Sequence, residues 1–230
     1  MKKIPLLLLS YLCISAPEGY ALASEKSTVL ITGSNRNIGL EFVKQFSKAG
    51  WRVIATTRSI DSADELIEFS KQNQNVIVEQ LDITNDQHLK NLKKKYEDDA
   101  IDILLNNAAY TPRYFSSFRG IGGVDIEATR KSFEINSIGT MKVIQTFIDN
   151  VEQSENGKIV NLSTKAASFD ERPKIPMMYS YAMSKAALNS MIKTLSFETI
   201  ESEIIVVALS PGIVNTTLGM GFMGAIDIDE

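Results

Sequence analysis

The sequence is nearly devoid of the two side chains that most often serve as metal ligands and nucleophiles. Its single cysteine, Cys13, lies in the N-terminal segment, and its single histidine, His88, lies in a lysine-rich stretch. Disulfides and thiol catalysis are therefore excluded for the rest of the chain, and one imidazole cannot supply a triad or a metal cluster. We interpret His88 as a solvated surface residue.

An excess of positive charge is also lacking. The 230 residues include 24 Lys and Arg against 28 Asp and Glu, which gives a formal net charge of -4. This balance argues against nucleic acid as a partner, because nucleic-acid-binding domains carry clustered basic charge. The length and the 44% of apolar residues fit one globular domain with a sizeable core.

A long, mostly apolar run lies at the N-terminus. A pair of lysines precedes the run at residues 4–14, and an Ala-Leu-Ala motif ends at Ala23. This order is typical of a secretory signal peptide, and the run is too short for a membrane-spanning helix. We assign residues 1–23 as a signal-peptide-like segment and residues 24–230 as a single domain. The segment predicts export or membrane association, and the alternative is an uncleaved, loosely anchored N-terminus.

From residue 28 onward, short apolar runs alternate with segments of helical periodicity. The expected strands are residues 28–32, 51–57, 75–80, 101–106, 158–162 and 204–209. The expected helices are residues 38–49, 61–71, 84–96, 127–151 and 178–200, the third of them opened by a capping box from Thr84 to Gln87. Strands that alternate with helices of this size predict βαβ units, and hence an α/β fold with a doubly wound parallel sheet.

A glycine-containing turn, TGSNRNIG from Thr32 to Gly39, joins the first expected strand to the first helix. A turn at a helix N-terminus offers backbone N–H groups and the positive end of the helix dipole to a pyrophosphate. Gly33 is expected to make the tight turn, and Gly39 to let the helix pack closely against the strand. The context predicts a dinucleotide site, and the alternative is a plain strand-to-helix turn.

Tyr181 and Lys185 lie four residues apart in the last expected helix, so they share one face of it. Free tyrosine titrates near a pKa of about 10 and is a poor acid at neutral pH. A nearby ammonium group favours the phenolate and lowers the tyrosine pKa. The pair therefore indicates acid–base catalysis, although two ordinary helix residues would show the same spacing.

Several motifs occur together in an order that resembles the short-chain dehydrogenase/reductase family, most closely its carbonyl-reductase and C-factor (Sniffer-like) branch. The resemblance covers residues 28–219. The residues that carry it are Thr32, Gly33, Gly39, Asp82, NNAA at 106–109, Asn136, VNLST at 160–164, Tyr181, Lys185 and PGIVNT at 211–216. It implies a Rossmann-type sheet of about six strands with helices on both faces. Too few residues follow the sixth strand for the family's last elements, so we expect strand seven to be missing.

The resemblance also implies the roles of the catalytic residues. Tyr181 would exchange a proton with the substrate oxygen, and Lys185 would lower the tyrosine pKa and bind the nicotinamide ribose. Asn136 would hold a water that links Lys185 to solvent. Thr164 occupies the place of the substrate-orienting serine, with Ser163 in reserve.

The cofactor site follows in the same way, with Asp82 at the adenine and Asn106 beside it, tying neighbouring strands. The expected cofactor-binding residues are Thr32, Gly33, Asn35, Arg36, Asn37, Ile38, Gly39, Arg58, Asp82, Ile83, Asn106, Ala108, Tyr181, Lys185, Pro211, Gly212, Val214 and Thr216. The second expected strand ends at Arg58 without the carboxylate that NAD enzymes place there. Because Arg36 and Arg58 could clamp a 2′-phosphate, the sequence predicts NADP(H), with NAD(H) as the less favoured cofactor.

These features predict an NADPH-dependent oxidoreductase that interconverts a small-molecule carbonyl and an alcohol by hydride transfer. The alternative is a non-catalytic nucleotide-binding or signalling protein, which is favoured by Asn37 in place of a family glycine and by the short C-terminus. A homodimer is expected through the helices at 127–151 and 178–200. A cytoplasmic location is the alternative to export, since reduced nicotinamide cofactors are regenerated inside the cell. An apolar substrate wall is expected from Phe115, Phe118, Phe169, Met177 and Met178.

Overall fold

The computed structural model describes residues 27–112, 120–172 and 178–212, together with residues 214, 226 and 228. The signal-peptide-like segment at residues 1–23 and the predicted cofactor contact Thr216 lie outside the described residues. Among the helices in the described ranges, none has the length and apolar character needed to cross a membrane.

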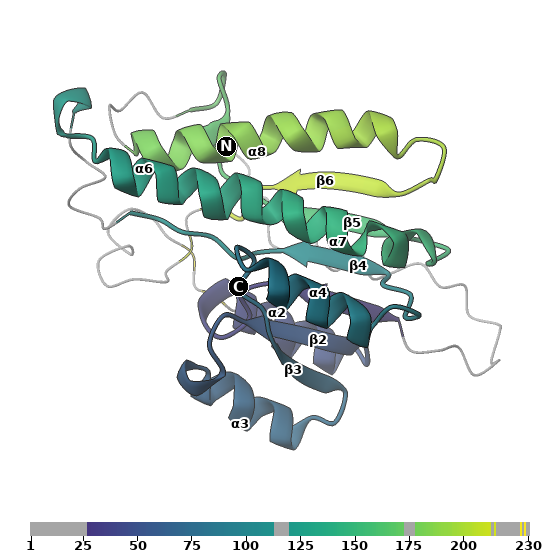
Figure 1. Ribbon diagram of the computed structural model, residues 1–230. Helices are drawn as coiled ribbons and strands as arrows, with labels where there is room; N and C mark the ends of the chain where they lie inside the picture. Colours follow the sequence, from purple (N-terminus) through teal and green to yellow (C-terminus); the bar gives the residue numbers. More distant parts are fainter. Residues whose placement is uncertain are drawn as a thin grey trace.

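A six-stranded sheet forms the centre of the molecule, and all its strand pairs are parallel (Figure 1). In spatial order the strands are β3 (Val76–Gln80), β2 (Arg52–Thr57), β1 (Thr28–Ile31), β4 (Ile103–Asn106), β5 (Lys158–Leu162) and β6 (Ile205–Leu209). The helices are α2 (Asn37–Lys48), α3 (Asp64–Gln72), α4 (Asp86–Lys95), α6 (Ile126–Phe133), α7 (Thr140–Glu152) and α8 (Tyr179–Glu198). The predicted doubly wound α/β fold with about six strands is confirmed.

Alternation along the buried strands assigns one set of side chains to each face of the sheet. Leu30, Leu104 and Ile159 belong to a core cluster that includes residues of α4, α7 and α8. Their strand neighbours, such as Ile31 and Leu105, belong to a second cluster with residues of α2 and α3. Helices therefore cover both faces. The order in which the strands are added reverses between β1 and β4. In sheets of this kind, ligands bind beside this point, at the carboxyl ends of the strands.

The helix expected over residues 127–151 is interrupted. Between α6 and α7 the backbone forms a π-helix from Glu134 to Gly139, with Asn136 inside it. Such one-turn bulges occur mostly within α-helices and frequently at functional sites. The interruption leaves Asn136 fully buried.

The predicted capping box from Thr84 to Gln87 is wrong. The N-cap of α4 is Asn85, whose side chain accepts hydrogen bonds from the N–H groups of Gln87 and His88. The hydroxyl of Thr84 donates instead to the carboxylate of Asp82 at 2.7 Å. The hydroxyl of Thr84 is therefore bonded to the Asp82 carboxylate and does not cap α4.

The helices expected at a homodimer interface carry exposed apolar side chains. Ile138 in the π-helix is 43% exposed, Met141 at the start of α7 is 40% exposed, and Met183 on α8 is 48% exposed. The homodimer stays a prediction. Past β6, the described residues form an isolated parallel bridge between Val214 and Ile226.

Candidate active site

The glycine turn after β1 is held by side chains from the end of β4. Thr32 Oγ1 accepts the N–H groups of Asn107 and Ala108, each at 3.0 Å. The amide of Asn107 donates to the carbonyls of Thr32 and Gly33, both at 2.9 Å. The predicted role of Thr32 in stabilising the turn fits these contacts. Sequence reasoning missed Asn107, although it is the second asparagine of the NNAA motif.

Both glycines of this turn lie where a side chain cannot fit. Gly33 has a φ of +69° and packs against Ala108, and a Cβ at Gly39 would lie 2.1 Å from the carbonyl oxygen of Gly33. Asn37, which stands where the family usually has glycine, adopts a φ of 50°. Asparagine tolerates this left-handed region better than most residues, so the turn keeps its shape.

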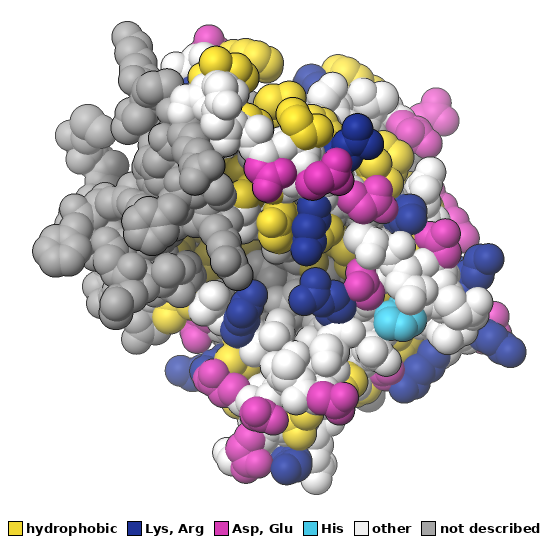
Figure 2. Space-filling model, turned by 60° about the vertical axis from the view of Figure 1, so that its left-hand side comes forward, with side chains coloured by type: hydrophobic (Ala, Val, Ile, Leu, Met, Phe, Trp, Pro, Cys, Tyr) yellow, Lys and Arg dark blue, Asp and Glu magenta, His cyan; other side chains and the backbone are white. Residues whose placement is uncertain are grey.

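The N-terminus of α2 is open toward this turn. Its N-cap, Arg36, makes no side-chain capping hydrogen bond, and Asn35 and Ile38 are half-buried in the turn. Uncapped N–H groups of a helix of this length form an anion-binding site. Arg36 and Arg58 are exposed, and neither guanidinium group has a partner within the described ranges. Figure 2 shows Lys and Arg side chains around a hollow in one face of the molecule.

The carboxyl ends of β3 and β4 bring the predicted adenine-side residues to the same edge. Asp82 is half-buried, and its Oδ1 accepts the N–H of Thr84 at 3.0 Å. Ile83 is only 5% exposed and packs in the core, so it can offer a ligand its backbone alone. Asn106 donates to Asn161 Oδ1 at 3.0 Å and so ties β4 to β5, as expected.

Asn136 joins three segments of the chain. Its Oδ1 accepts the N–H of Tyr110 at 2.7 Å, and its Nδ2 donates to the Tyr110 carbonyl at 2.9 Å and to Ser184 Oγ at 3.0 Å. Tyr110 lies in the loop after β4, and Ser184 directly precedes Lys185 on α8. The π-helix therefore fixes α8 to the loop after β4. The water-holding role of Asn136 stays a prediction.

Lys185 is buried, with 3% of its surface exposed, and its Nζ donates to the carbonyl of Leu162 at the end of β5 at 2.7 Å. Burial lowers the pKa of Lys185 to about 8. Burial also raises the pKa of Tyr181, which is opposite to the direction expected from its neighbouring lysine. The cause of both shifts is desolvation, which penalises the charged form of either group.

Because its pKa in the folded protein is below the ordinary 10.5, Lys185 makes stability depend on pH. The folded state binds fewer protons than the unfolded state between about pH 8 and 10.5, so the free energy of unfolding rises with pH across this window. We expect Lys185→Met to abolish this rise and to add about 2 kcal/mol at pH 7, the lost hydrogen bond offsetting part of the gain.

Urea unfolding at pH 7 to 10 would measure this effect, with Lys193→Met, an exposed lysine of the same helix, as control. An equal pH slope in wild type and Lys185→Met would contradict it.

The two hydroxyl residues after β5 point to different partners. Ser163 is 7% exposed and donates to Asn189 Oδ1 on α8 at 2.6 Å. Thr164 is half-buried, and its Oγ1 accepts the N–H of Ala166 at 3.2 Å, while its O–H has no acceptor among the described residues. This arrangement favours Thr164 over Ser163 for contact with a substrate.

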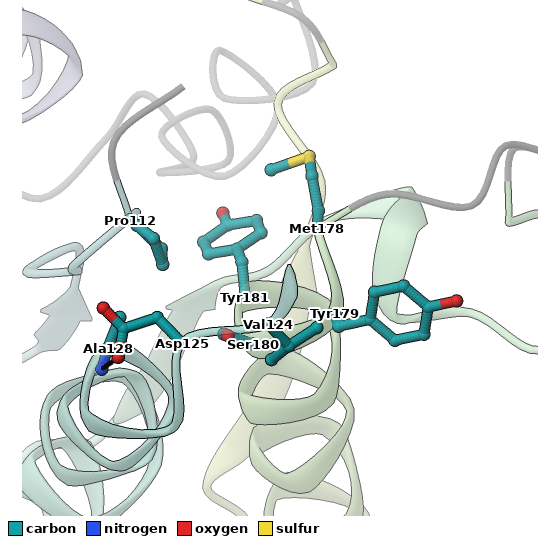
Figure 3. A pocket seen from close by; sticks show the side chains of 8 residues that line it. All are labelled: Pro112, Val124, Asp125, Ala128, Met178, Tyr179, Ser180 and Tyr181. Carbon is teal, nitrogen blue, oxygen red and sulfur yellow. Dashed lines mark hydrogen bonds between the residues drawn. The ribbon is translucent and has the colours of Figure 1, made fainter. Parts of the chain in front are cut away.

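A small cavity of about 10 Å³, roughly the space of one water molecule, lies beside Tyr181 at the base of an open recess (Figure 3). Its lining residues are Pro112, Val124, Asp125, Ala128, Met178, Tyr179, Ser180 and Tyr181. Met178 therefore lies at the wall, as expected. Phe169 does not, because it is 96% exposed on the surface. Phe115, Phe118 and Met177 lie outside the described residues.

The remaining predicted residues follow β6 at the same edge of the sheet. Pro211 is half-buried, Gly212 has a φ of 83°, and Val214 is 9% exposed. A left-handed glycine here lets the chain turn directly after the strand. The edge of the sheet therefore gathers the glycine turn, the Asp82 turn and the Tyr181–Lys185 pair.

Comparisons with known proteins match this arrangement. A family model described as short chain dehydrogenase matches residues 27–223. An uncharacterized oxidoreductase of Schizosaccharomyces pombe is 34% identical over 198 residues, which cover 84% of this chain and 76% of that protein. The carbonyl reductase Sniffer of D. melanogaster is 25% identical with a TM-score of 0.77, covering 89% of this chain and 88% of that one. The NADPH-bound carbonyl reductase from chicken fatty liver is 25% identical with a TM-score of 0.78, covering 89% and 87%. The chain thus belongs to the short-chain dehydrogenase/reductase family of oxidoreductases.

Proposed function

We propose that this protein is an NADPH-dependent oxidoreductase that interconverts a small-molecule carbonyl and an alcohol. The observation that carries the proposal is the position of Tyr181 at a cavity, one helical turn before the buried ammonium group of Lys185. On one helix face, the phenol can donate a proton, and the buried cation can stabilise the phenolate that results.

The residues present fit a dinucleotide. The glycine turn has no room for side chains at Gly33 and Gly39, and the N–H groups at the start of α2 are uncapped. A pyrophosphate accepts hydrogen bonds from such N–H groups. At the adenine end, Asp82 offers a carboxylate oxygen that has no donor in the described part of the chain.

The bound nicotinamide dinucleotide would supply or take up a hydride at the substrate carbon. Tyr181 donates its phenolic proton to the carbonyl oxygen, and Lys185 stabilises the phenolate that remains. A lysine with a pKa of about 8 is mostly protonated at neutral pH and can hold this charge. The free O–H of Thr164 donates to the oxygen on which negative charge develops. Asn136 keeps α8 in place through Ser184.

The preference for NADPH is assigned to Arg58, which directly follows β2, and to Arg36 at the start of α2. The chicken carbonyl reductase was crystallised with NADPH, and the 2′-phosphate that distinguishes it from NADH suits a guanidinium group. We expect Arg58→Asp to weaken NADPH binding by about 10- to 100-fold, because it removes a charge-assisted hydrogen bond and adds repulsion.

Fluorescence titration of the full chain with NADPH and NADH would test both cofactor binding and this preference. Arg130→Asp serves as the matched control, since Arg130 is an exposed arginine on α6 that pairs with Glu127. An unchanged ratio of NADPH to NADH affinity in Arg58→Asp would remove Arg58 from the site. If the wild type bound neither cofactor, the proposed function would fail.

A further inference from the structure

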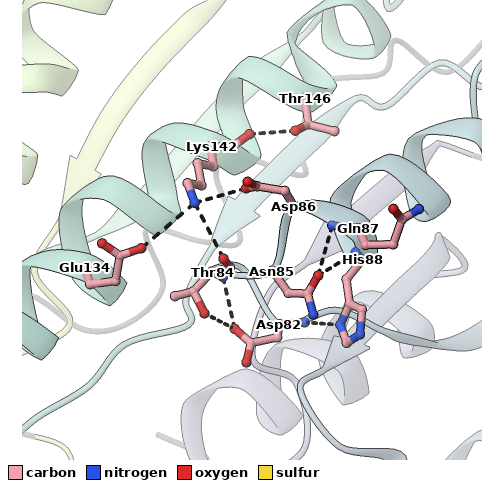
Figure 4. A network of polar contacts seen from close by, with 9 residues as sticks. All are labelled: Asp82, Thr84, Asn85, Asp86, Gln87, His88, Glu134, Lys142 and Thr146. Carbon is pink, nitrogen blue, oxygen red and sulfur yellow. Dashed lines mark hydrogen bonds and ion pairs between the residues drawn. The ribbon is translucent and has the colours of Figure 1, made fainter.

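The backbone of Asp82 is the first part of the chain beyond the sheet ladder. The N–H of Leu81 still donates to the Thr57 carbonyl of β2 at 2.8 Å. The next N–H, that of Asp82, has no strand partner and donates instead to Nδ1 of His88 at 3.1 Å (Figure 4). The interpretation of His88 as a solvated surface residue is therefore incomplete, because the residue is half-buried and its ring holds a turn of the main chain.

The turn that begins at Asp82 is closed from several sides. Its carbonyl accepts the N–H of Asn85 at 2.9 Å, and its Oδ1 accepts both the N–H and the hydroxyl of Thr84. The side chain of Lys142 on α7 donates to the Thr84 carbonyl at 3.5 Å and pairs with Asp86 at 3.0 Å. Within the described part of the chain, the unused groups of the turn include the second carboxylate oxygen of Asp82 and the N–H of Ile83.

An acceptor and a donor on consecutive residues can match one edge of adenine. The exocyclic amine of adenine donates a hydrogen bond, and the adjacent ring nitrogen accepts one. Hypoxanthine, in which a carbonyl replaces the amine and the ring nitrogen is protonated, presents the opposite pattern. The turn can therefore distinguish an aminopurine from its deaminated form only while both groups hold their orientation.

We propose that His88 is a positioning residue for the adenine end of the cofactor site, a role that rests on the proposed function. Nδ1 can accept from Asp82 only in the neutral ring, whose proton is then on Nε2. Protonation adds a hydrogen at Nδ1 and removes the acceptor. The charged groups of this network are Asp82 in the turn, Asp86 on α4, Lys142 on α7 and Glu134 on the π-helix. Lys142 engages Asp86, Glu134 and the Thr84 carbonyl, whereas the N–H of Asp82 is held by the imidazole.

The test compares NADPH with its hypoxanthine analogue, using the full chain and four variants of one helix turn. His88→Ala should bind NADPH about 3- to 10-fold more weakly, the effect of one hydrogen bond, with the analogue unaffected. His88→Asn should restore binding, because its Oδ1 takes the place of Nδ1 as an acceptor. His88→Gln should not, because its amide extends one atom further. Gln87→Ala, which loses a contact with Asn91 on the exposed side of α4, should match the wild type.

The hypoxanthine analogue separates positioning from a purely structural role, because a loss of folding would weaken the binding of both dinucleotides alike. Equal losses in His88→Ala and His88→Asn, or equal losses for NADPH and its hypoxanthine analogue, would overturn the proposal. If the wild type bound neither dinucleotide, the proposed function would fail first and this inference with it.

Discussion

Tyr181→Phe is expected to lower kcat by about 10³-fold, because it removes the proton donor from the substrate oxygen. The variant keeps the ring that lines the cavity, so the fold and the NADPH affinity should be unchanged. The measurement is NADPH oxidation with a panel of small aldehydes and ketones, at saturating NADPH.

The matched control is Tyr179→Phe, two residues earlier on α8. Figure 3 shows the Tyr179 hydroxyl pointing away from Tyr181, and we expect activity within about 2-fold of the wild type. Turnover by Tyr181→Phe close to that of the wild type would mean that another group supplies the proton. NADPH binding without turnover of any carbonyl by the wild type would favour the non-catalytic nucleotide-binding alternative.

Gly39→Ala is expected to destabilise the protein by about 3 kcal/mol or more and to abolish NADPH binding. The new Cβ would lie 2.1 Å from the Gly33 carbonyl oxygen and 2.6 Å from the Asn107 amide. The nearest of these atoms is backbone, so the contact cannot be relieved by a rotamer change. The phosphate turn and α2 must separate, which displaces the N–H groups that would meet a pyrophosphate.

Alanine variants of two other glycines serve as controls, which distinguish the effect of the steric clash from that of backbone strain. Gly50→Ala introduces a side chain at a φ of +86° with nothing within 4 Å, so we expect only the strain cost of about 1 kcal/mol. Gly122→Ala, with neither positive φ nor contact, should be neutral. Urea unfolding and NADPH titration measure both effects. A Gly39→Ala variant as stable as Gly122→Ala would refute the close packing of this turn.

Most of the fold could be predicted because a doubly covered parallel sheet needs continuous apolar runs. The strand at 158–162 was predicted with its observed bounds, and the other strands within two residues. The π-helix could not be predicted, because one extra residue in a turn leaves the apolar periodicity on either side intact. The helical periodicity of apolar residues, which is judged over many residues, therefore does not reveal such an interruption.

The sequence predicts those site properties that follow from the type and spacing of the side chains. It does not predict properties that depend on burial or on backbone partners. The spacing of Tyr181 and Lys185 indicates their pairing, but the direction of the tyrosine pKa depends on desolvation, which no spacing reports. His88 was missed because its partner is a backbone N–H, and backbone partners leave no signal in the sequence. Asn107 was missed for the same reason.

Under the proposed function, the buried ammonium group of Lys185 lowers the thermal stability of the protein and at the same time supports turnover. Each folded molecule holds a cation away from water, and an apolar residue in its place would make the chain more robust. Laboratory evolution that selected only for survival of heating would favour loss of this lysine, and under the proposed function the more stable protein would be inactive. Only selection that also demands turnover would retain it.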